Sequence, residues 1–390
     1  MTNRILTTHV GSLPRPHDLL DMMKAKHSGG KVDPAAYQKR VRTAVRDSVK
    51  QQKASGIDIV ADGEQSKPGF FSYVRERLDG FEPRPGMKFH MFAAELKSFP
   101  EYYEQYFKEA MLGGTVTAFA PLVCTGPVKY RDMEPLKRDL ANLKAAMAAA
   151  KVEDGFMPAI GPSGVGVNEY YKSEEEYFYA VGAAMRTEYK AIVEAGLTVQ
   201  IDDPFLCDML IDPLLTAKQK SKTAWMYVDA INESIKGLPE GKVRFHTCYS
   251  INEGPRIHDV SLEEAFKYVL KVNASAYSFE YANPRHEHEY HMWENVKLPD
   301  GKKLIPGMVM HAVNIVEHPE LIAERLMRFA NLVGRENVIA GCDCGFSSQA
   351  TYKTEVHPTV MWAKFEAMRQ GADIATRRLW KRGGASKKVK

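Results

Sequence analysis

The stretch RFHTCYS, residues 244–250, places a histidine and a cysteine two positions apart. If the stretch is a β-strand, His246 and Cys248 project to the same side, because strand residues i and i+2 share a face. An imidazole beside a thiol fits three interpretations: two ligands of a metal ion, a nucleophile with its base, or two residues that face the core. The nucleophilic pair is the weaker one, because no residue that would orient the histidine is evident.

Zinc is the metal that the residue types favour, since it takes thiolate, imidazole and carboxylate ligands in a tetrahedron. Glu280 follows a later apolar run, and Cys342 and Cys344 form a Cys-Asp-Cys sequence after another. The ends of neighbouring strands lie about 4.8 Å apart, so side chains from these ends can converge on one ion. The spacing matches no zinc finger.

The histidine-rich stretch PRHEHEYH is a rival metal site. His286, His288 and His291 are close in the sequence, but their charged surroundings predict a solvated, exposed loop. No GxGxxG follows a predicted strand and no P-loop is present, so the sequence gives no basis for dinucleotide or ATP chemistry.

Eight short apolar runs are spaced along the chain, and most are separated by a helical pattern. The runs are 5–12, 57–64, 155–163, 197–205, 243–250, 276–283, 304–312 and 337–346. Helices are predicted over 33–56, 173–196, 261–273 and 318–334, several of them with an Asp or Ser cap or a terminal Gly. Eight strand–helix units predict an α/β fold, a (β/α)₈ barrel.

Polar residues follow nearly every apolar run, where the predicted strands end. They are His9, Ser12, Asp62, Glu64, Asp202, Asp203, His246, Cys248, Glu280, His311 and Cys342 to Cys344. In such a barrel the carboxyl ends of the strands surround one face, and active sites are built there. The sequence therefore predicts a catalytic site at this face.

A large insertion, residues 65–130, follows the second run and is rich in Phe and Tyr. We expect it to form helices and a hairpin over the barrel mouth; a small satellite core is the alternative. The catalytic barrel is predicted to span 1–380. The basic tail 381–390 is expected to be disordered.

Composition excludes several classes of protein. The net charge of +4 in 390 residues is too small to argue for nucleic-acid binding, and no run of about 18 apolar residues predicts a membrane span. The N-terminus lacks the apolar region of a secretory signal. Five cysteines form no disulfide framework, which favours a reducing cytoplasm and metal or thiol chemistry.

The sequence resembles the cobalamin-independent methionine synthase family, specifically its C-terminal catalytic barrel. The motifs TTHVGS, ADGE, IDDP, HTCY, FEYAN and DCG occur in the family's order and at its strand ends, and they cover most of the chain. The resemblance implies a (β/α)₈ barrel that binds Zn²⁺ and methylates the thiol of homocysteine to give methionine.

The resemblance also implies a zinc ligand set. The four positions that match are His246, Cys248, Glu280 and Cys344. Four protein ligands normally close a zinc site, whereas a catalytic zinc keeps one position open. We expect Glu280, the one hard oxygen donor, to give way to the substrate thiol. Cys342 stays open as an alternative to Cys344.

The substrate residues are implied in the same way. Glu64 and Asp202 would bind the ammonium group of homocysteine, and the backbone at Gly11 and Ser12 would hold its carboxylate. His311 corresponds to the histidine that shuttles a proton.

Three departures from the family concern mainly the methyl donor. Full-length members have two barrels, and the one that helps to hold the polyglutamyl folate has no counterpart here. The tryptophan that stacks on the pterin aligns near Asn168, with Tyr170 or Tyr171 as candidate replacements. Asp203 stands where the family has Glu. The sequence therefore leaves the donor open between methyl-tetrahydrofolate, methylcobalamin and another electrophile.

Other functions remain to be weighed. Epoxyalkane:coenzyme M transferases are single-barrel relatives that use the same zinc on a different thiol. Their substrate needs positive groups for a sulfonate, so the carboxylates Glu64 and Asp202 favour an amino-acid thiol. A uroporphyrinogen-type decarboxylase, which needs no metal, and a catalytically silent barrel are the remaining alternatives. No pattern indicates the oligomeric state.

Overall fold

The computed structural model describes residues 3–87, 92–111, 114–117, 120–249 and 254–380. The predicted basic tail, 381–390, lies outside the described residues. None of the helices in these ranges has the length and apolar character that a membrane crossing requires.

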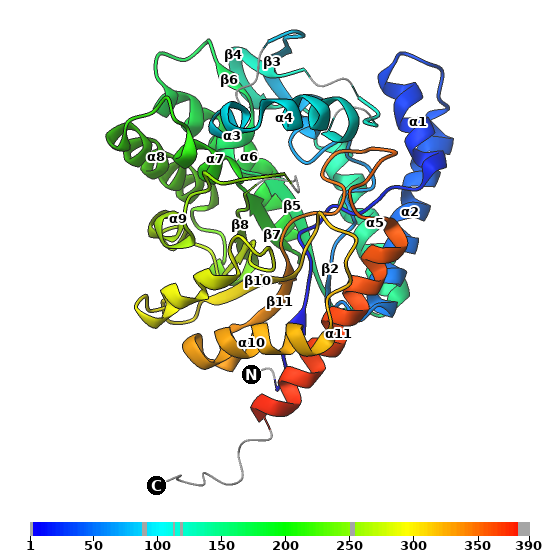
Figure 1. The fold of residues 1–390 in the computed structure, drawn as a ribbon. Coiled ribbons are helices and arrows are strands. Elements are labelled where there is room, and N and C mark those ends of the chain that lie inside the picture. Colours follow the sequence, from blue (N-terminus) through cyan, green and yellow to red (C-terminus); the bar gives the residue numbers. More distant parts are fainter. Residues whose placement is uncertain (1–2, 88–91, 112–113, 118–119, 250–253, 381–390) are drawn as a thin grey trace, which may run out of the picture.

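One parallel sheet of eight strands forms the centre of the molecule (Figure 1). Its strands, in sheet order, are β1 (Leu6–Thr7), β11 (Ile339–Cys342), β10 (Lys303–Val309), β9 (Ala276–Phe279), β8 (Val243–His246), β7 (Thr198–Asp202), β5 (Asp154–Ile160) and β2 (Ile59–Val60). A parallel bridge between Thr8 and Ile59 joins the two ends of the sheet. Each predicted run overlaps one strand, with β5 and β10 beginning one residue earlier than predicted, and the predicted (β/α)₈ barrel is confirmed.

Helices cover the outside of the strands (Figure 1). Those that follow the barrel strands are α1 (His17–His27), α2 (Pro34–Ala54), α5 (Glu134–Ala150), α6 (Glu174–Glu194), α7 (Phe205–Ile211), α8 (Ala217–Ile235), α9 (Leu262–Val269), α10 (Pro319–Val333) and α11 (Pro358–Trp380).

The predicted helix ends agree with the structure where a cap was recognised. The Asp33 carboxylate accepts hydrogen bonds from the N–H groups of Ala35 and Ala36 at the start of α2. Ser173 and Ser261 cap α6 and α9 in the same manner. These caps satisfy amide groups that have no partner inside a helix.

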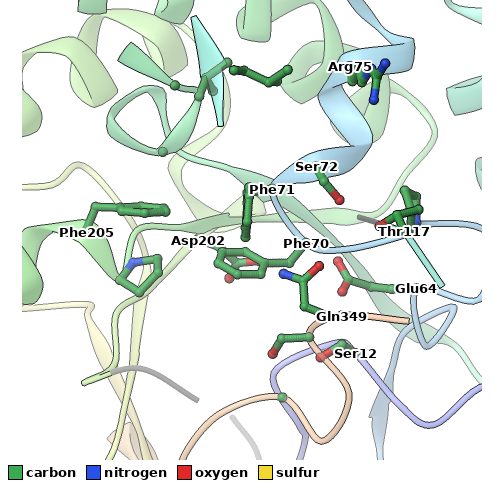
Figure 2. Close-up of a pocket in the computed structure, with 18 of the residues that line it drawn as sticks. Ser12, Glu64, Phe70, Phe71, Ser72, Arg75, Thr117, Asp202, Phe205 and Gln349 are labelled. Carbon is green, nitrogen blue, oxygen red and sulfur yellow. The ribbon is translucent and has the colours of Figure 1, made fainter. Parts of the chain in front are cut away.

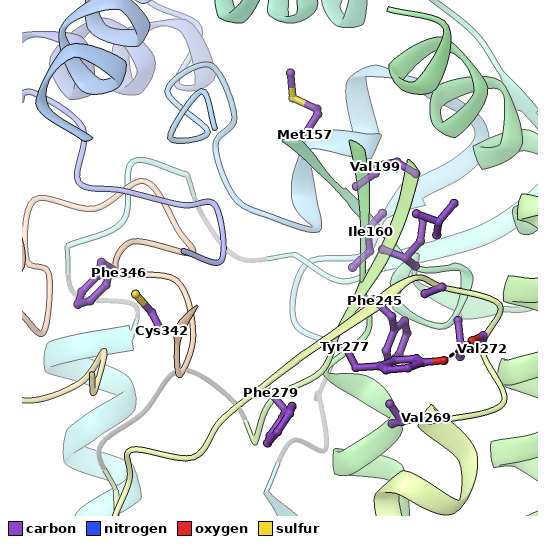
Figure 3. Packing of buried hydrophobic residues seen from close by; sticks show 14 of the residues in the cluster. Met157, Ile160, Val199, Phe245, Val269, Val272, Tyr277, Phe279, Cys342 and Phe346 are labelled. Carbon is purple, nitrogen blue, oxygen red and sulfur yellow. Dashed lines mark hydrogen bonds between the residues drawn. The ribbon is translucent and has the colours of Figure 1, made fainter. Parts of the chain in front are cut away.

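The strand side chains that face the helices form the main core (Figure 3). Phe245 of β8, Tyr277 of β9 and Phe279 of β9 are buried there, and the Tyr277 hydroxyl donates to the carbonyl of Val272 at 3.0 Å. Burial of such rings contributes roughly 1.5–3 kcal/mol each. The core therefore holds the strand ends in fixed positions.

The insertion contains η1 (Ser72–Glu76), β3 (Leu78–Pro83), α3 (Ala93–Ser98), α4 (Pro100–Tyr106), the π-helical turn η2 (Phe107–Met111) and β4 (Leu122–Tyr130). Strands β3 and β4 form an antiparallel hairpin, to which β6 (Val167–Asn168) adds in parallel. Phe92, Tyr103 and Tyr106 make a separate small core. The satellite core is thus present, and other aromatic residues of the insertion face the cavity described below.

Candidate metal and substrate site

Two thiols and one imidazole meet beyond the carboxyl ends of β8 and β11. The ligand atoms of His246, Cys248 and Cys344 all lie within 4.8 Å of one another, and all three residues are buried. The two Sγ atoms are 3.4 Å apart, and neither cysteine forms a disulfide with a residue in the described ranges. His246 is the last residue of β8, whereas Cys248 and Cys344 lie in the loops that follow β8 and β11.

The chemistry of this donor set fits zinc. Both ring nitrogens of His246 are buried and make no hydrogen bond to any described residue. Burial lowers the pKa of His246 to about 3, and the charges of Arg244 and His311 add to the effect. Neutral imidazole and cysteine thiolate are groups that bind zinc, and a metal ion would give one of these buried ring nitrogens a ligand bond.

Glu280, the fourth predicted ligand, belongs to a second group. Its ligand atom lies within 4.8 Å of those of His311 and Asp343, and all three residues are buried. The Glu280 carboxylate accepts from the Tyr249 N–H at 3.2 Å and pairs with Arg285 at 3.3 Å. Its role as an exchangeable zinc ligand stays a prediction.

Asp343 was not identified from the sequence as a separate site residue. Its Oδ1 accepts hydrogen bonds from the N–H groups of Tyr281 and Ala282, and its Oδ2 has no hydrogen-bond partner in the described chain. Burial and the neighbouring charge of Glu280 raise the pKa of Asp343 to about 8.

Cys342 is separated from the thiol pair. It is fully buried in the main core, and its Sγ lies 4.0 Å from the carbonyl oxygen of Thr8. Figure 3 shows it beside Phe346. Because β11 ends at Cys342, the strand alternation does not extend to Cys344, and only Cys344 reaches Cys248.

A cavity of about 720 Å³ connects these groups with the predicted substrate residues. Ser12, Glu64 and Asp202 line it together with His246, Cys248 and Cys344. Figure 2 shows Ser12 and Glu64 on one side of the cavity and Phe205 on the other. A cavity of this size suits a ligand larger than an amino acid.

Glu64 and Asp202 are both buried carboxylates. Glu64 has a left-handed backbone with φ of 54°, and its N–H donates to the Asp62 carboxylate at 2.9 Å. A non-glycine residue in this conformation is strained, which is typical of functional sites. Burial raises the pKa of Asp202 well above its ordinary value, and the charge of Glu64 adds to the rise. A bound cation would therefore stabilise the ionised forms of these two carboxylates.

The backbone N–H of Gly11 already has a hydrogen-bond partner within the protein. Its N–H donates to His9 Nδ1 at 3.2 Å, and with a φ of 139° an added Cβ would lie 2.4 Å from Pro158 Cγ. Ser12 lines the cavity, and its carbonyl accepts from the Phe346 N–H. Of these two residues, Ser12 is therefore the better candidate for the predicted role of holding the substrate carboxylate, which stays a prediction.

Two buried cations escaped the sequence analysis. Lys67 donates to the Glu64 carboxylate at 3.1 Å and to the Pro158 carbonyl at 2.7 Å. Arg244, with 3% of its surface exposed, donates to the His9 carbonyl and lies over the ring of Phe156. Arg244 precedes His246 by two positions, so strand alternation offered a signal; Lys67 follows Glu64 in a loop and offered none.

Aromatic residues from two segments form one wall of the cavity. Phe70 and Phe71 of the insertion line it, and Phe70 stacks on Phe205 with ring centroids 6.4 Å apart. Tyr170 and Tyr171, the candidate replacements for the missing tryptophan, are absent from the lining; Tyr170 is 49% exposed. The aromatic rings in the lining are therefore mostly those of phenylalanines, with Tyr249 added.

The prediction of an exposed histidine loop is wrong for His286. His288 and His291 are exposed, but His286 is 3% exposed and stacks on Tyr249 with centroids 3.7 Å apart. Its Nδ1 lies 2.8 Å from Glu289 and its Nε2 3.2 Å from Asp259. Glu289 from within the loop and Asp259 from outside it pair with the buried ring, and the spacing of the histidines does not reveal Asp259.

We expect the stability contribution of His286 to depend on pH. Burial opposes the charged ring, but the hydrogen bonds to Asp259 and Glu289 prevail and raise the pKa of His286 to about 9. The raised pKa stabilises the fold fully below pH of about 6.5, and this contribution is lost as the pH rises through about 9. His286→Gln should therefore lower the free energy of unfolding by on the order of 1–3 kcal/mol more at pH 6 than at pH 9.5.

Urea unfolding at the two pH values measures this difference. His291→Gln is the matched control, because that side chain is 58% exposed in its pair with Glu294. An equal loss for His286→Gln at both pH values would contradict the assignment.

The fold and the site together define a (β/α)₈-barrel protein with a buried thiol–imidazole cluster in its cavity. A family model described as the catalytic domain of cobalamin-independent synthase matches residues 5–88 and 103–365. The chain belongs to this family.

Curated relatives match along most of their length. A methionine synthase of Sulfolobus acidocaldarius is 25% identical over 343 residues, 87% of this chain and 85% of the relative. One from Saccharolobus solfataricus is 23% identical, covering 97% and 96% of the two chains. The solved B12-independent methionine synthase of Shewanella sp. W3-18-1 superposes with a TM-score of 0.71 at 20% identity, over 97% of this chain and 99% of that chain. This last likeness supports the fold.

Proposed function

We propose that this protein is a zinc-dependent S-methyltransferase that converts homocysteine to methionine. The observation that carries the proposal is the shared cavity, which joins a zinc-type donor set to two buried carboxylates. The curated relatives named above are methionine synthases, and the Shewanella structure contains selenomethionine.

The charges around the cavity support an amino-acid thiol as substrate. Glu64 and Asp202 are two carboxylates, and Lys67 compensates one of them. The remaining negative charge attracts one ammonium group, whereas the sulfonate of coenzyme M would be repelled. This balance favours homocysteine over coenzyme M.

His246, Cys248 and Cys344 would hold the zinc, with Glu280 as the predicted exchangeable ligand. When bound, zinc supplies the acidity that keeps a substrate thiol deprotonated and nucleophilic near neutral pH. The remaining work falls to the protein's own residues.

The carboxylates of Glu64 and Asp202 bind the ammonium group and orient the amino acid, so that its sulfur points toward the proposed zinc ligands. The phenylalanine wall excludes water and positions the donor's methyl carbon in line with that sulfur. The sulfur forms a bond to the methyl carbon as the bond to the donor breaks, and the departing donor atom keeps the electron pair. Where the donor atom is a nitrogen it must gain a proton, and His311 is the proposed relay.

The test measures zinc and turnover on the same preparation. We expect about one zinc per chain and formation of methionine from homocysteine with one of three donors: methyl-tetrahydrofolate, methylcobalamin or methyl iodide. Coenzyme M, with the same donors and with an epoxide, is the comparison thiol. Turnover with coenzyme M alone would replace the proposal with the epoxyalkane transferase alternative, and absence of zinc would contradict it outright.

A further inference from the structure

The cavity has a second end that the proposed thiol chemistry does not use. Its lining includes four basic side chains: Arg75, Lys26, which pairs with the adjacent Glu76, Arg131, which donates to the Arg75 carbonyl, and Arg138. In Figure 2, Arg75 lies on the far side of the view from Ser12 and Glu64. Positive charge is therefore concentrated away from the carboxylates that line the inner end.

The basic residues outnumber the acidic ones at this outer end. Glu76 and Asp132 are the carboxylates of the lining next to Arg75 and Arg131 in the chain, and Asp79 pairs with Arg131, so four positive and three negative charges leave a net charge of +1. Lys26 is engaged by Glu76 at 2.8 Å, and Arg131 by Asp79 at 3.4 Å.

Arg75 and Arg138 carry the uncompensated charge. Both are exposed, and neither forms an ion pair with any residue in the described ranges. Arg75 belongs to η1 and Arg138 to α5. Guanidinium groups bind carboxylate or phosphate oxygens in a bidentate fashion.

The cavity is larger than homocysteine alone would fill. Homocysteine is a small amino acid, and a volume of about 720 Å³ is typical of a site for a much larger ligand. Phe70 and Phe71 line the same cavity, so an apolar wall is available to the body of that ligand.

We propose that Arg75 and Arg138 form a binding site for the anionic end of the alkyl donor. The donor would place its reactive carbon at the thiol end, its apolar body against the phenylalanines and a carboxylate or phosphate group at the two arginines. This inference rests on the proposed function, because it assigns the outer end of the same cavity. Carboxylates and phosphates share the chemistry that the arginines recognise.

Binding is tested first, without turnover. Calorimetry of the whole protein with γ-linked triglutamate and with pyrophosphate separates the two anion sources. We expect one of them to bind to the wild type, more weakly at higher ionic strength, and to lose at least about tenfold in affinity in the Arg75→Glu/Arg138→Glu double variant. Binding of neither anion, or equal binding to both proteins, would overturn the inference.

Lys144→Glu is the matched control, because Lys144 is an exposed cation on the same helix as Arg138 and does not line the cavity. It should leave anion affinity unchanged. Thermal unfolding of each variant checks that the fold persists, and Arg75→Gln/Arg138→Gln replaces the double variant if charge reversal prevents folding.

Turnover then distinguishes this inference from the proposed function. Methyl-tetrahydropteroyltriglutamate carries carboxylates, methylcobalamin carries a phosphodiester, and methyl iodide carries no charge. We expect the double variant to raise KM for the charged donor about tenfold more than KM for methyl iodide. Equal effects would refute the arginine site, whereas failure of the wild type with every donor would refute the methyltransferase proposal and leave the binding result standing.

Discussion

Replacing Cys344 by serine will remove stoichiometric zinc from the protein, whereas the same change at Cys342 will leave the metal in place. Cys344 Sγ lies 3.4 Å from Cys248 Sγ and within reach of His246, while Cys342 is enclosed in the apolar core. A serine hydroxyl is a much poorer zinc ligand than a thiolate, so the loss of one of these sulfurs leaves the donor set incomplete.

The expected magnitudes are large. Zinc content should fall from about one per chain to near zero in Cys344→Ser and Cys248→Ser. The rate of methyl transfer should fall by more than about 100-fold, because loss of a residue that only supports a metal ligand already costs roughly 10–100-fold. Metal analysis after dialysis and the homocysteine assay provide the two readings.

Cys342→Ser is the matched control, since it makes the same chemical change in the same segment. Burying a hydroxyl in the core will lower its thermal stability but not its zinc content. The ligand assignment is wrong if Cys342→Ser loses the metal or if Cys344→Ser retains it.

Removing a carboxylate at the amino-group site will weaken homocysteine binding. Asp202 is buried, and burial together with the charge of Glu64 raises its pKa, so its ionised form gains most from a bound ammonium group. Loss of one partner of a buried charge pair costs about 3 kcal/mol, or roughly 150-fold in affinity. We therefore expect Asp202→Asn to raise KM for homocysteine by about this factor.

Glu64→Gln should have a similar effect on KM and an additional effect on stability. Lys67, buried beside Glu64, loses the partner that lies 3.1 Å away. Unfolding measurements on Glu64→Gln and Asp202→Asn separate the two effects, because Lys67 is paired with Glu64 alone among these two carboxylates.

Comparing homocysteine with a thiol that lacks the amino group tests whether the carboxylates recognise the ammonium group. With 4-mercaptobutanoate, which lacks the ammonium group of homocysteine, the KM of Asp202→Asn should differ little from that of the wild type. Asp132→Asn is the control, because Asp132 lines the same cavity at its other end and is exposed. A parallel rise in KM for both thiols would show that Asp202 acts on the fold and not on the amino group.

The sequence determined the architecture of this protein. Alternation of apolar runs with capped amphipathic segments predicts eight strand–helix units, and parallel strands joined by helices close into a barrel whose active face lies at the strand ends. Asp33 and Ser173 are caps that the local pattern alone identifies, because they act on amide groups within three residues of themselves.

Only the tertiary structure decided which polar residues meet. Strand alternation does not extend into the loops, so the positions of Cys248 and Cys344 depend on the backbone beyond the last strand residues. It also could not reveal Lys67 beside Glu64, because a spacing of three residues brings side chains together reliably only in a helix, or His286 beside Asp259, which lies 27 residues away in the chain. Periodicity fixes the direction of a side chain within an element, whereas the encounter of loop residues is set by how the whole barrel closes.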